Sequence, residues 1–294
     1  MLAYMVALLI IVGIYALLTI SLDLQYGFTG LVNFGLVAFF AIGAYGSALV
    51  TLAGYPVALG FTTAIAAAAV AALPIGALAV RLREDYLAIV TLGFSEVVRL
   101  ALVNEEWLTK GSMGLPGIPR PFGGLPAGWN DLAYLALVLA CNVAVVLIVR
   151  RIVGSPFGRL IQAIRDNEVT VVSLGKSPTS AKVRALLVGA GIAGLAGALY
   201  AHYITFVVPD QFLPIVTFYV WMAMILGGVG SLRGSLVGAA VLVLILEGTR
   251  FVRDLLPGVA EVEMASVRLA LVGILLVVFM LYRPQGLFGN AGRQ

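Results

Sequence analysis

The sequence predicts an all-α integral membrane protein with about nine transmembrane helices, in a range of about eight to ten. Its 294 residues are 62% hydrophobic and 11% charged, whereas soluble domains carry roughly 25% charged residues. The mean hydropathy is +1.08. Apolar runs of about 20 residues recur along the chain, and each is long enough to cross about 30 Å of hydrocarbon as a helix.

We expect residues 1–294 to form a single transmembrane domain, with spans at the apolar runs and breaks at clusters of Gly, Pro and charged residues. Residues 1–22 lack a basic leader and a convincing cleavage site before Asp23, so this first run is expected to be a retained span. The expected spans are 2–22, 31–53, 57–80, 86–103, 132–149, 183–208, 214–228, 234–249 and 266–282.

The charges between the spans predict the orientation of the chain. In the loop at about 150–184, Lys and Arg outnumber Asp and Glu, and such loops stay in the cytoplasm. Because successive loops lie on opposite sides of the membrane, segment 81–85 and the carboxyl end are expected in the cytoplasm. Segments 104–131 and 209–213 are expected outside. The outer loop contains GSMGLPGIPRPFGGLPAG, whose Gly and Pro density excludes a regular helix.

The stretch VGAGIAGLAGA contains the G-x-G-x-x-G spacing of a dinucleotide-binding turn, with Asp210 at about the position of the ribose-binding acid. Such a site needs a soluble βαβ unit, and the continuous apolar run 183–208 favours a spanning helix instead. We therefore interpret Gly191, Gly194 and Gly197 as small residues on a helix face against which another helix packs closely. A membrane-bound flavoenzyme is the alternative, which flavin absorbance would test.

No other motif indicates an enzyme. The chain has a single histidine, His202, and a single cysteine, Cys141, and it lacks a phosphate-binding loop. We expect a packed or interfacial histidine in preference to a proton relay, no metal site and no cofactor bound by this chain. The net charge of +4 is explained by membrane orientation, so nucleic acid is not expected as a partner.

The cytoplasmic loop is longer than orientation alone requires. Residues 159–172 are expected to form a short amphipathic helix, ended by a left-handed cap at Gly175. A partial apolar stripe in the cytoplasm favours a protein partner. The stripe consists of Ile161, Ile164, Val169 and Val172.

This loop resembles the ATPase-contacting loop of ABC-importer permeases, in the form found in branched-chain amino-acid permeases. The resemblance covers nearly the whole chain, which is similar to the M-type subunit of that family. In the amino-terminal half the motifs are LVNFG (31–35), IGAY (42–45), TLGFSE (91–96) and LTKGSMGL (108–115). In the carboxyl half they are GR (158–159), AIRDNE (163–168), SLG (173–175), AGLAGALYA (193–201), GGVGS (227–231) and RPQGL (283–287).

The resemblance implies a multi-pass permease of the bacterial inner membrane that forms the translocation pathway of an importer for branched-chain or related amino acids. It implies a second related permease subunit, two cytoplasmic ATP-binding subunits and a periplasmic amino-acid-binding protein, with lipid around the spans. ATP and Mg²⁺ would be used by the partner subunits. The residues implied to couple to the ATPase are Arg165, Asp166, Asn167, Glu168, Leu174 and Gly175.

Candidates for the translocation pathway come from two kinds of pattern. Gly-rich breaks at 27–30 and 227–231 occupy matching positions in the two halves and indicate either discontinuous helices or ordinary tight turns. Asn33 is the polar group to test beside the first break. Glu96 and Arg99 share a helix face, as a structural pair or as a polar lining for an amino-acid head group.

Two alternatives concern the transport reaction. An ion-coupled secondary transporter would use Glu96 as a proton or sodium site, and ATP-dependent uptake with separate ATPase subunits would distinguish it. An importer of the same type would act on urea or short amides, which binding measurements on the cognate periplasmic protein would distinguish.

Overall fold

A computed structural model describes residues 2–79, 82, 84–124, 126 and 129–255, together with 273–274, 277, 281 and 286–288. These residues form eleven α-helices, two 3-10 helices and two very short strands. The helices are α1 (Leu2–Gln25), α2 (Leu36–Leu52), α3 (Val57–Ala79), α4 (Glu84–Asn104), α5 (Glu106–Thr109), α6 (Trp129–Gly154), α7 (Pro156–Asp166), α8 (Glu168–Ser173), α9 (Pro178–Ile204), α10 (Ile215–Gly227) and α11 (Leu232–Leu255). The remaining elements are η1 (Gly111–Met113), β1 (Leu115–Pro116), β2 (Phe206–Val207) and η2 (Pro209–Phe212).

The all-α class is confirmed, but the expected count of about nine spans is not. Six segments in the described residues are long and apolar enough to cross a membrane, and α2 is a shorter apolar helix. The expected span 234–249 lies within α11, and the expected span 266–282 lies largely outside the described residues. The six segments are Ala3–Gln25, Val57–Ala79, Asp85–Asn104, Trp129–Gly154, Pro178–Ile204 and Pro209–Gly227.

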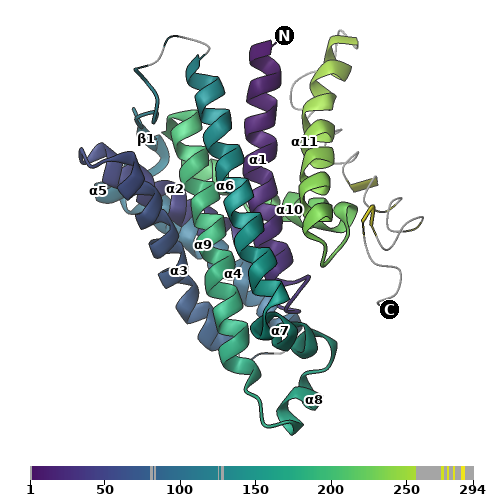
Figure 1. Cartoon of the computed structure of the whole chain (residues 1–294). Helices are drawn as coiled ribbons and strands as arrows, with labels where there is room; N and C mark the ends of the chain where they lie inside the picture. Colours follow the sequence, from purple (N-terminus) through teal and green to yellow (C-terminus); the bar gives the residue numbers. More distant parts are fainter. Residues whose placement is uncertain are drawn as a thin grey trace.

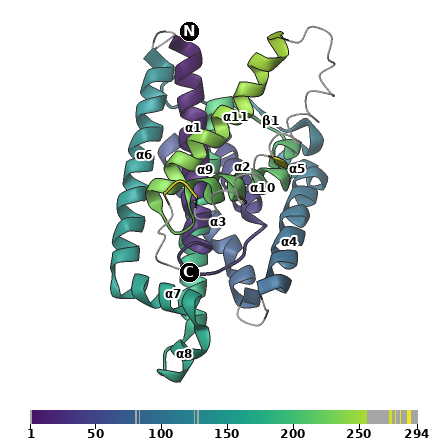
Figure 2. The same ribbon diagram turned by 90° about the vertical axis from the view of Figure 1, so that its right-hand side faces the viewer.

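The long helices form one bundle, from which α7 and α8 project at the end opposite the start of α1 (Figure 1). Helices α2, α3 and α9 pack against one another, and α1 contacts α6, α9 and α11. The view turned by 90° places α4 and α6 on opposite sides of the bundle (Figure 2). Because the basic loop is expected in the cytoplasm, the start of α1 is expected at the outer end.

The glycine-rich stretch of α9 lies at close contacts with α2 and α3. A Cβ atom on Gly194 would lie 2.6 Å from the Cβ atom of Ala68, and one on Gly191 would lie 3.3 Å from a methyl carbon of Ile65. At Gly197 it would overlap the backbone carbonyl of Phe40, and Gly43 of α2 meets the Gly194 backbone in the same way. Small residues thus bring the three helices to backbone contact, as they do in other membrane bundles.

The second span was expected at 31–53, but α2 begins only at Leu36 because residues 26–35 are not helical. Gly30 has a φ of +78°, which an α-helix cannot include. The segment is nevertheless mostly buried, with Phe28 and Leu31 each 4% exposed. The chain therefore has an irregular, enclosed break between α1 and α2.

The end of α9 also differs from the expected span 183–208. The helix ends at Ile204, because Thr205 adopts a left-handed conformation with a φ of +63°. Strand β2 then pairs antiparallel with β1, and the amide of Ile118 donates to the Thr205 carbonyl at 3.1 Å. These bonds fasten the Gly- and Pro-rich outer loop to the end of α9.

Candidate functional site

The segment between α6 and α9 folds into two helices, so the expected single helix over 159–172 is wrong. Ser155 caps α7 by accepting a hydrogen bond from the amide of Gly158 at 3.2 Å. Asn167 has φ −160° and ψ 99°, outside the helical region, and its side chain accepts from the amide of Thr170 at 3.0 Å. A short polar side chain that bonds the nearby backbone favours a cap over a helix interior, so a new helix starts here.

Gly175 follows α8 in the left-handed conformation, with a φ of +72°. Its amide donates to the carbonyl of Val172 at 2.9 Å. A Cβ atom on Gly175 would meet nothing within 4 Å, so the backbone conformation and not a close neighbour favours glycine. The predicted left-handed cap is confirmed.

The apolar stripe of this segment is divided between the interior and the surface. Ile161 and Ile164 lie in the core of the chain, with exposed fractions of 0% and 3%. Val169, Val172 and Leu174 are 78%, 56% and 73% exposed. The expected single partner-facing stripe is therefore wrong, because its first two members pack against the rest of this chain. We call the three exposed residues the α8 tip.

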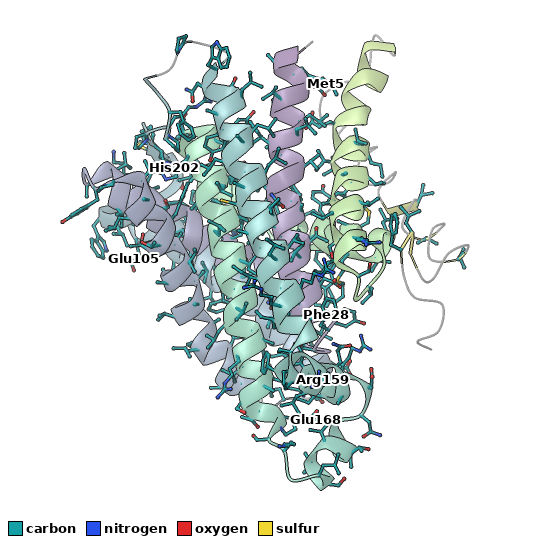
Figure 3. The ribbon with its side chains drawn as sticks, viewed as in Figure 1. Met5, Phe28, Glu105, Arg159, Glu168 and His202 are labelled. Atoms are coloured by element: carbon teal, nitrogen blue, oxygen red, sulfur yellow. The ribbon has the colours of Figure 1, made fainter. Side chains whose placement is uncertain are left out.

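Helix α8 is tied to the bundle at its start and at its buried face. The ammonium of Lys182 on α9 donates to the carboxylate of Glu168 at 2.7 Å, and Val171 is only 4% exposed. Figure 3 shows Glu168 beyond Arg159 at the far end of the molecule. The α8 tip is thus presented on a short helix with fixed contacts.

Arg165 points into the bundle and not toward the α8 tip. Its Nη1 atom donates to the carbonyl oxygen of Gly27 at 2.6 Å, and its Nη2 and Nε atoms donate to one oxygen of Asp166 at 2.7 and 3.0 Å. The Arg165 side chain is 22% exposed and that of Asp166 is 65% exposed. Arg165 therefore connects α7 to the break between α1 and α2.

Asn33 lies in a buried polar network beside this break. Its amide nitrogen donates to Oε1 of Gln25 at 2.7 Å, and its side-chain oxygen accepts from the amide of Gly35 at 2.8 Å. Gln25 donates to Ser21 at 3.2 Å, and Ser21 donates to the carbonyl of Gly189 in α9 at 2.7 Å. The side chain of Asn33 thus orders the start of α2 and links it to α1.

Hydroxyl groups from two other helices complete the start of α2. The amide of Phe34 donates to Oγ1 of Thr91 in α4 at 3.0 Å, and the amide of Val37 donates to Oγ1 of Thr217 in α10 at 3.1 Å. The Phe34 ring stacks on Trp221, with centroids 5.0 Å apart. Helices α1, α2, α4, α9 and α10 therefore share this polar region, and the sequence patterns do not indicate the role of either threonine.

Glu96 and Arg99 form the expected pair on α4. The Nε atom of Arg99 donates to both carboxylate oxygens of Glu96, at 3.0 and 3.1 Å. The structure adds Asp210 of η2, whose Oδ1 atom lies 3.8 Å from Nη1 of Arg99. The side chains of Arg99, Glu96 and Asp210 are 18%, 41% and 82% exposed. The glycine fingerprint had suggested Asp210 only as a ribose ligand; its contact with Arg99 makes it part of this charged group.

His202 is packed inside the bundle and is fully buried. Its Nε2 atom contacts the hydroxyl of Ser47, its Nδ1 atom contacts the carbonyl of Pro119, and its ring meets Phe61 edge-on. The label of His202 in Figure 3 lies near the outer loop, far from Glu168. These contacts fit the expected packed histidine.

Asp23 is a functional candidate that our sequence reasoning missed. It is fully buried near the end of α1. Its Oδ1 atom accepts from the amide of Gly230 at 2.7 Å and its Oδ2 atom accepts from the hydroxyl of Ser235 at 3.1 Å. An acidic residue at the end of an apolar span is by itself a reason to suspect function, and that signal could have identified Asp23.

The described residues thus provide three features with different chemistry. The α8 tip is an exposed apolar surface. The break between α1 and α2 carries buried hydrogen-bonding groups, and Glu96, Arg99 and Asp210 form a charged group on α4 and η2. No group of three or more His, Cys, Asp or Glu side chains in this part of the chain is arranged to hold a metal ion.

In the described residues, a bundle with six helices apolar and long enough to cross a membrane, joined by a basic segment, defines a polytopic helical membrane protein. The family model for the permease component of branched-chain amino acid transport systems matches residues 4–280. The chain belongs to this family of permeases.

Relatives support the same assignment. The chain is similar to the high-affinity branched-chain amino acid transport system permease protein LivM of Salmonella typhimurium and to that of Escherichia coli. Each is 35% identical over 301 residues, which cover 93% of this chain and 67% of the relative. A probable branched-chain amino acid transport permease protein LivM of Methanocaldococcus jannaschii is 26% identical over 314 residues, which cover 94% and 90% of the two chains. No solved structure matches the chain significantly.

Proposed function

We propose that this chain is the transmembrane permease subunit of an ATP-driven importer for branched-chain or related amino acids. The observation that carries the proposal is the α8 tip, an exposed apolar surface on a short helix at the cytoplasmic end of a family permease. An apolar surface at this place is suited to a groove on a cytoplasmic protein. That protein is an ATPase subunit that binds ATP and Mg²⁺, while this chain binds no cofactor of its own.

The contacts of α7 and α8 support a mechanical role. Ile161 and Ile164 bury α7 in the bundle, and the Glu168–Lys182 ion pair ties α8 to α9. When closure of the ATPase subunits displaces the α8 tip, these contacts move α7 and the start of α9 with it as a rigid body. Asp166, Asn167 and Gly175 set the shape of the segment and so belong to the same coupling function.

The rest of the assembly follows from the same proposal. A second, related permease subunit completes the translocation pathway, a periplasmic amino-acid-binding protein delivers the solute, and the complex lies in the bacterial inner membrane. Leucine, isoleucine and valine are the proposed substrates because the relatives are named for branched-chain amino acid transport. Glu96, Arg99 and Asp210 carry both signs of charge, as does the head group of a free amino acid.

Reconstitution tests the coupling. The chain, its second permease, the ATPase subunits and the binding protein are placed in proteoliposomes, and leucine uptake and ATP hydrolysis are measured. Val172→Asp introduces a charge on the α8 tip, so ATPase binding and uptake are expected to fall at least about tenfold, a loss that corresponds to about 1.4 kcal/mol of binding energy. Thr179→Asp introduces the same charge at another exposed position and is expected to leave both unchanged.

Three results would contradict the proposal. Normal ATPase binding and uptake in Val172→Asp would exclude the α8 tip as the docking surface. Uptake by vesicles that lack the ATPase subunits but carry an ion gradient would favour a secondary transporter. A cognate binding protein that binds urea or short amides, and not leucine, isoleucine or valine, would change the substrate class.

A further inference from the structure

Three segments that are distant in the sequence meet at one place on the cytoplasmic side of the bundle. They are the break between α1 and α2, the break between α10 and α11, and helix α7. A Cβ atom on Gly27 would lie 2.6 Å from the amide nitrogen of Gly230, and one on Gly230 would lie 3.3 Å from the carbonyl oxygen of Gly27. The two helix breaks therefore touch each other through backbone. We call this contact, with Asp23, Arg165 and Ser235, the Gly27–Gly230 junction.

Asp23 binds the second break from the first helix. It accepts from the amide of Gly230 at 2.7 Å and from the hydroxyl of Ser235 at 3.1 Å. Its carboxylate is fully buried, and a buried carboxylate requires hydrogen bonds and a compensating charge. Gly230 and Ser235 supply the hydrogen bonds, and the guanidinium of Arg165 adds an electrostatic interaction with Asp23.

Arg165 reaches the same place from α7. It donates to the Gly27 carbonyl at 2.6 Å, and a Cβ atom on Gly230 would lie 3.5 Å from its Nη1 atom. A Cβ atom on Gly30 would lie 3.2 Å from its Cγ atom. The arginine thus binds the first break and lies beside the second, while Asp166 fixes the orientation of its planar head.

The second break is also held from another side. The amides of Leu287 and Phe288 donate to the carbonyls of Leu226 and Gly227, each at 2.9 Å. These are carbonyls at the end of α10, which have no partner within the helix. The end of α10 is therefore fixed, so a displacement at Gly230 acts on α10 as a whole.

The junction leads directly to the buried polar network. Beyond Gly27 the chain passes to Asn33, whose backbone carbonyl accepts from the indole N–H of Trp221 in α10 at 3.1 Å. Thr217, also in α10, accepts from the amide of Val37 at the start of α2. A movement of the two breaks therefore changes the start of α2 and the face of α10 together.

We propose that Asp23 and Arg165 are positioning residues that lock both helix breaks to α7 and transmit its displacement to the polar network. This inference rests on the proposed importer function and assigns Arg165 a role inside the permease. Arg165 is expected to act on the permease interior while the α8 tip binds the ATPase. Asp23 and Ser235 hold the second break to the first, so that both follow α7.

The test uses the complete importer in proteoliposomes and measures three quantities: ATPase binding, ATP hydrolysis stimulated by the binding protein, and leucine uptake. Arg165→Gln removes the charge and the guanidinium bonds, and Ser235→Ala removes one bond to Asp23. Both variants are expected to bind the ATPase subunits normally and to take up about tenfold less leucine per ATP hydrolysed, the scale of one lost hydrogen bond to a charged group. Arg159→Gln, on the exposed side of the same helix, is the matched control and should be unchanged.

A double variant shows whether Arg165 and Ser235 act together in one function or whether their substitutions cause two independent defects. Arg165→Gln combined with Ser235→Ala is expected to lose no more coupling than the stronger single variant, because residues that act as a unit are not additive. Asp23→Asn keeps the shape of the side chain and removes its charge, and it should reproduce the loss in Arg165→Gln. Thermal unfolding of each variant shows whether the effect is merely structural.

The outcomes distinguish this inference from the proposed function. Loss of ATPase binding in Arg165→Gln would place Arg165 at the partner surface and overturn the junction role, leaving the importer function intact. Unchanged uptake per ATP in Arg165→Gln and Ser235→Ala, or multiplying losses in the double variant, would also overturn it. If the wild-type chain binds no ATPase subunit at all, the proposed function itself fails.

Discussion

The Nε2 atom of His202 lies 2.8 Å from the Oγ atom of Ser47, and its Nδ1 atom lies 2.7 Å from the carbonyl oxygen of Pro119. A carbonyl only accepts hydrogen bonds, so Nδ1 carries the proton, and the Ser47 hydroxyl donates to Nε2. Ser47 belongs to α2 and Pro119 to the outer loop. One neutral imidazole on α9 therefore joins three segments.

Ser47→Ala is expected to lower the free energy of unfolding by about 1–3 kcal/mol, because it leaves a buried nitrogen acceptor without a donor. Unfolding of the purified chain in detergent, followed by heat or denaturant, measures the loss. Ser180→Ala removes a hydroxyl at an exposed position near the start of α9 and should have little effect. Equal losses in the two variants would contradict the structural role of the Ser47–His202 bond.

Gly194→Ala is expected to destabilise the bundle by about 1–3 kcal/mol, the usual cost of adding a carbon to a filled core. The added methyl group would lie 2.6 Å from the Cβ atom of Ala68, so α3 and α9 must separate. Gly93→Ala is the matched control in α4, because nothing lies within 4 Å of its Cβ position. That variant should be neutral or slightly stabilising. A Gly194→Ala chain as stable as the control would show that the close packing is not required.

Gly175→Val tests the left-handed cap after α8. The φ of +72° is unfavourable for a β-branched residue, so the end of α8 should shift while membrane insertion stays normal. ATPase binding and uptake are both expected to fall. Gly175→Asn should retain most of both, since asparagine tolerates this conformation. Transport by the valine variant at the wild-type rate would remove Gly175 from the coupling function.

Glu168→Lys makes a related prediction at the other end of α8. It replaces the 2.7 Å ion pair with Lys182 by a repulsion between two cations, so α8 should lose its attachment to α9. ATP hydrolysis is expected to continue with less uptake per ATP, which parallel assays in proteoliposomes would measure. Adding Lys182→Glu restores opposite charges and should recover part of the coupling. Failure of the double variant to recover any would argue against the ion pair as the cause.

The charged group on α4 and η2 gives a prediction about the solute. Glu96→Gln and Arg99→Gln are each expected to reduce leucine uptake at an unchanged level of protein in the membrane, because both groups face an amino-acid head group under the proposed function. Glu105→Gln changes an acidic residue in the outer loop, outside this group, and serves as the control. Unchanged uptake in both of the first two variants would leave Glu96 and Arg99 as a structural pair only.

Local patterns in the sequence predicted the helical class and most helix positions well. The apolar runs near 57–80, 86–103 and 132–149 correspond to α3, α4 and α6, because a span must be both apolar and continuous. The Gly-rich break at 27–30 was predicted, but its extension through residue 35 was not, since Leu31, Val32 and Phe34 are as apolar as a helix in lipid. Hydropathy measures transfer to the bilayer and not backbone conformation, so it extends a span through an enclosed break.

The contacts of the candidate site were harder to predict for a different reason. Asp23 and Ser235 are 212 positions apart, and Arg165 and Gly27 are 138 apart. Neither pairing has a local signature, and each depends on how segments distant in the sequence, α1 with α11 or the break after α1 with α7, are arranged. The i to i+3 pair of Glu96 and Arg99 was predictable because a single helix brings both residues to one face. Asn167 is partly predictable. The amphipathic pattern of residues 159–172 continues through it, but its side chain caps α8 and so divides the pattern into two helices.

The bonds from Leu287 and Phe288 to the end of α10 have a consequence for biosynthesis. The residues that satisfy those two carbonyls are synthesised only after the whole of α11, so α10 enters the bilayer before its final acceptors are covered. Such a distant pairing forms late. A nascent chain that ends before Gly286 would leave the carbonyls of Leu226 and Gly227 without these two donors. The end of α10 is therefore completed only after the segment that contains Leu287 and Phe288 has packed against it.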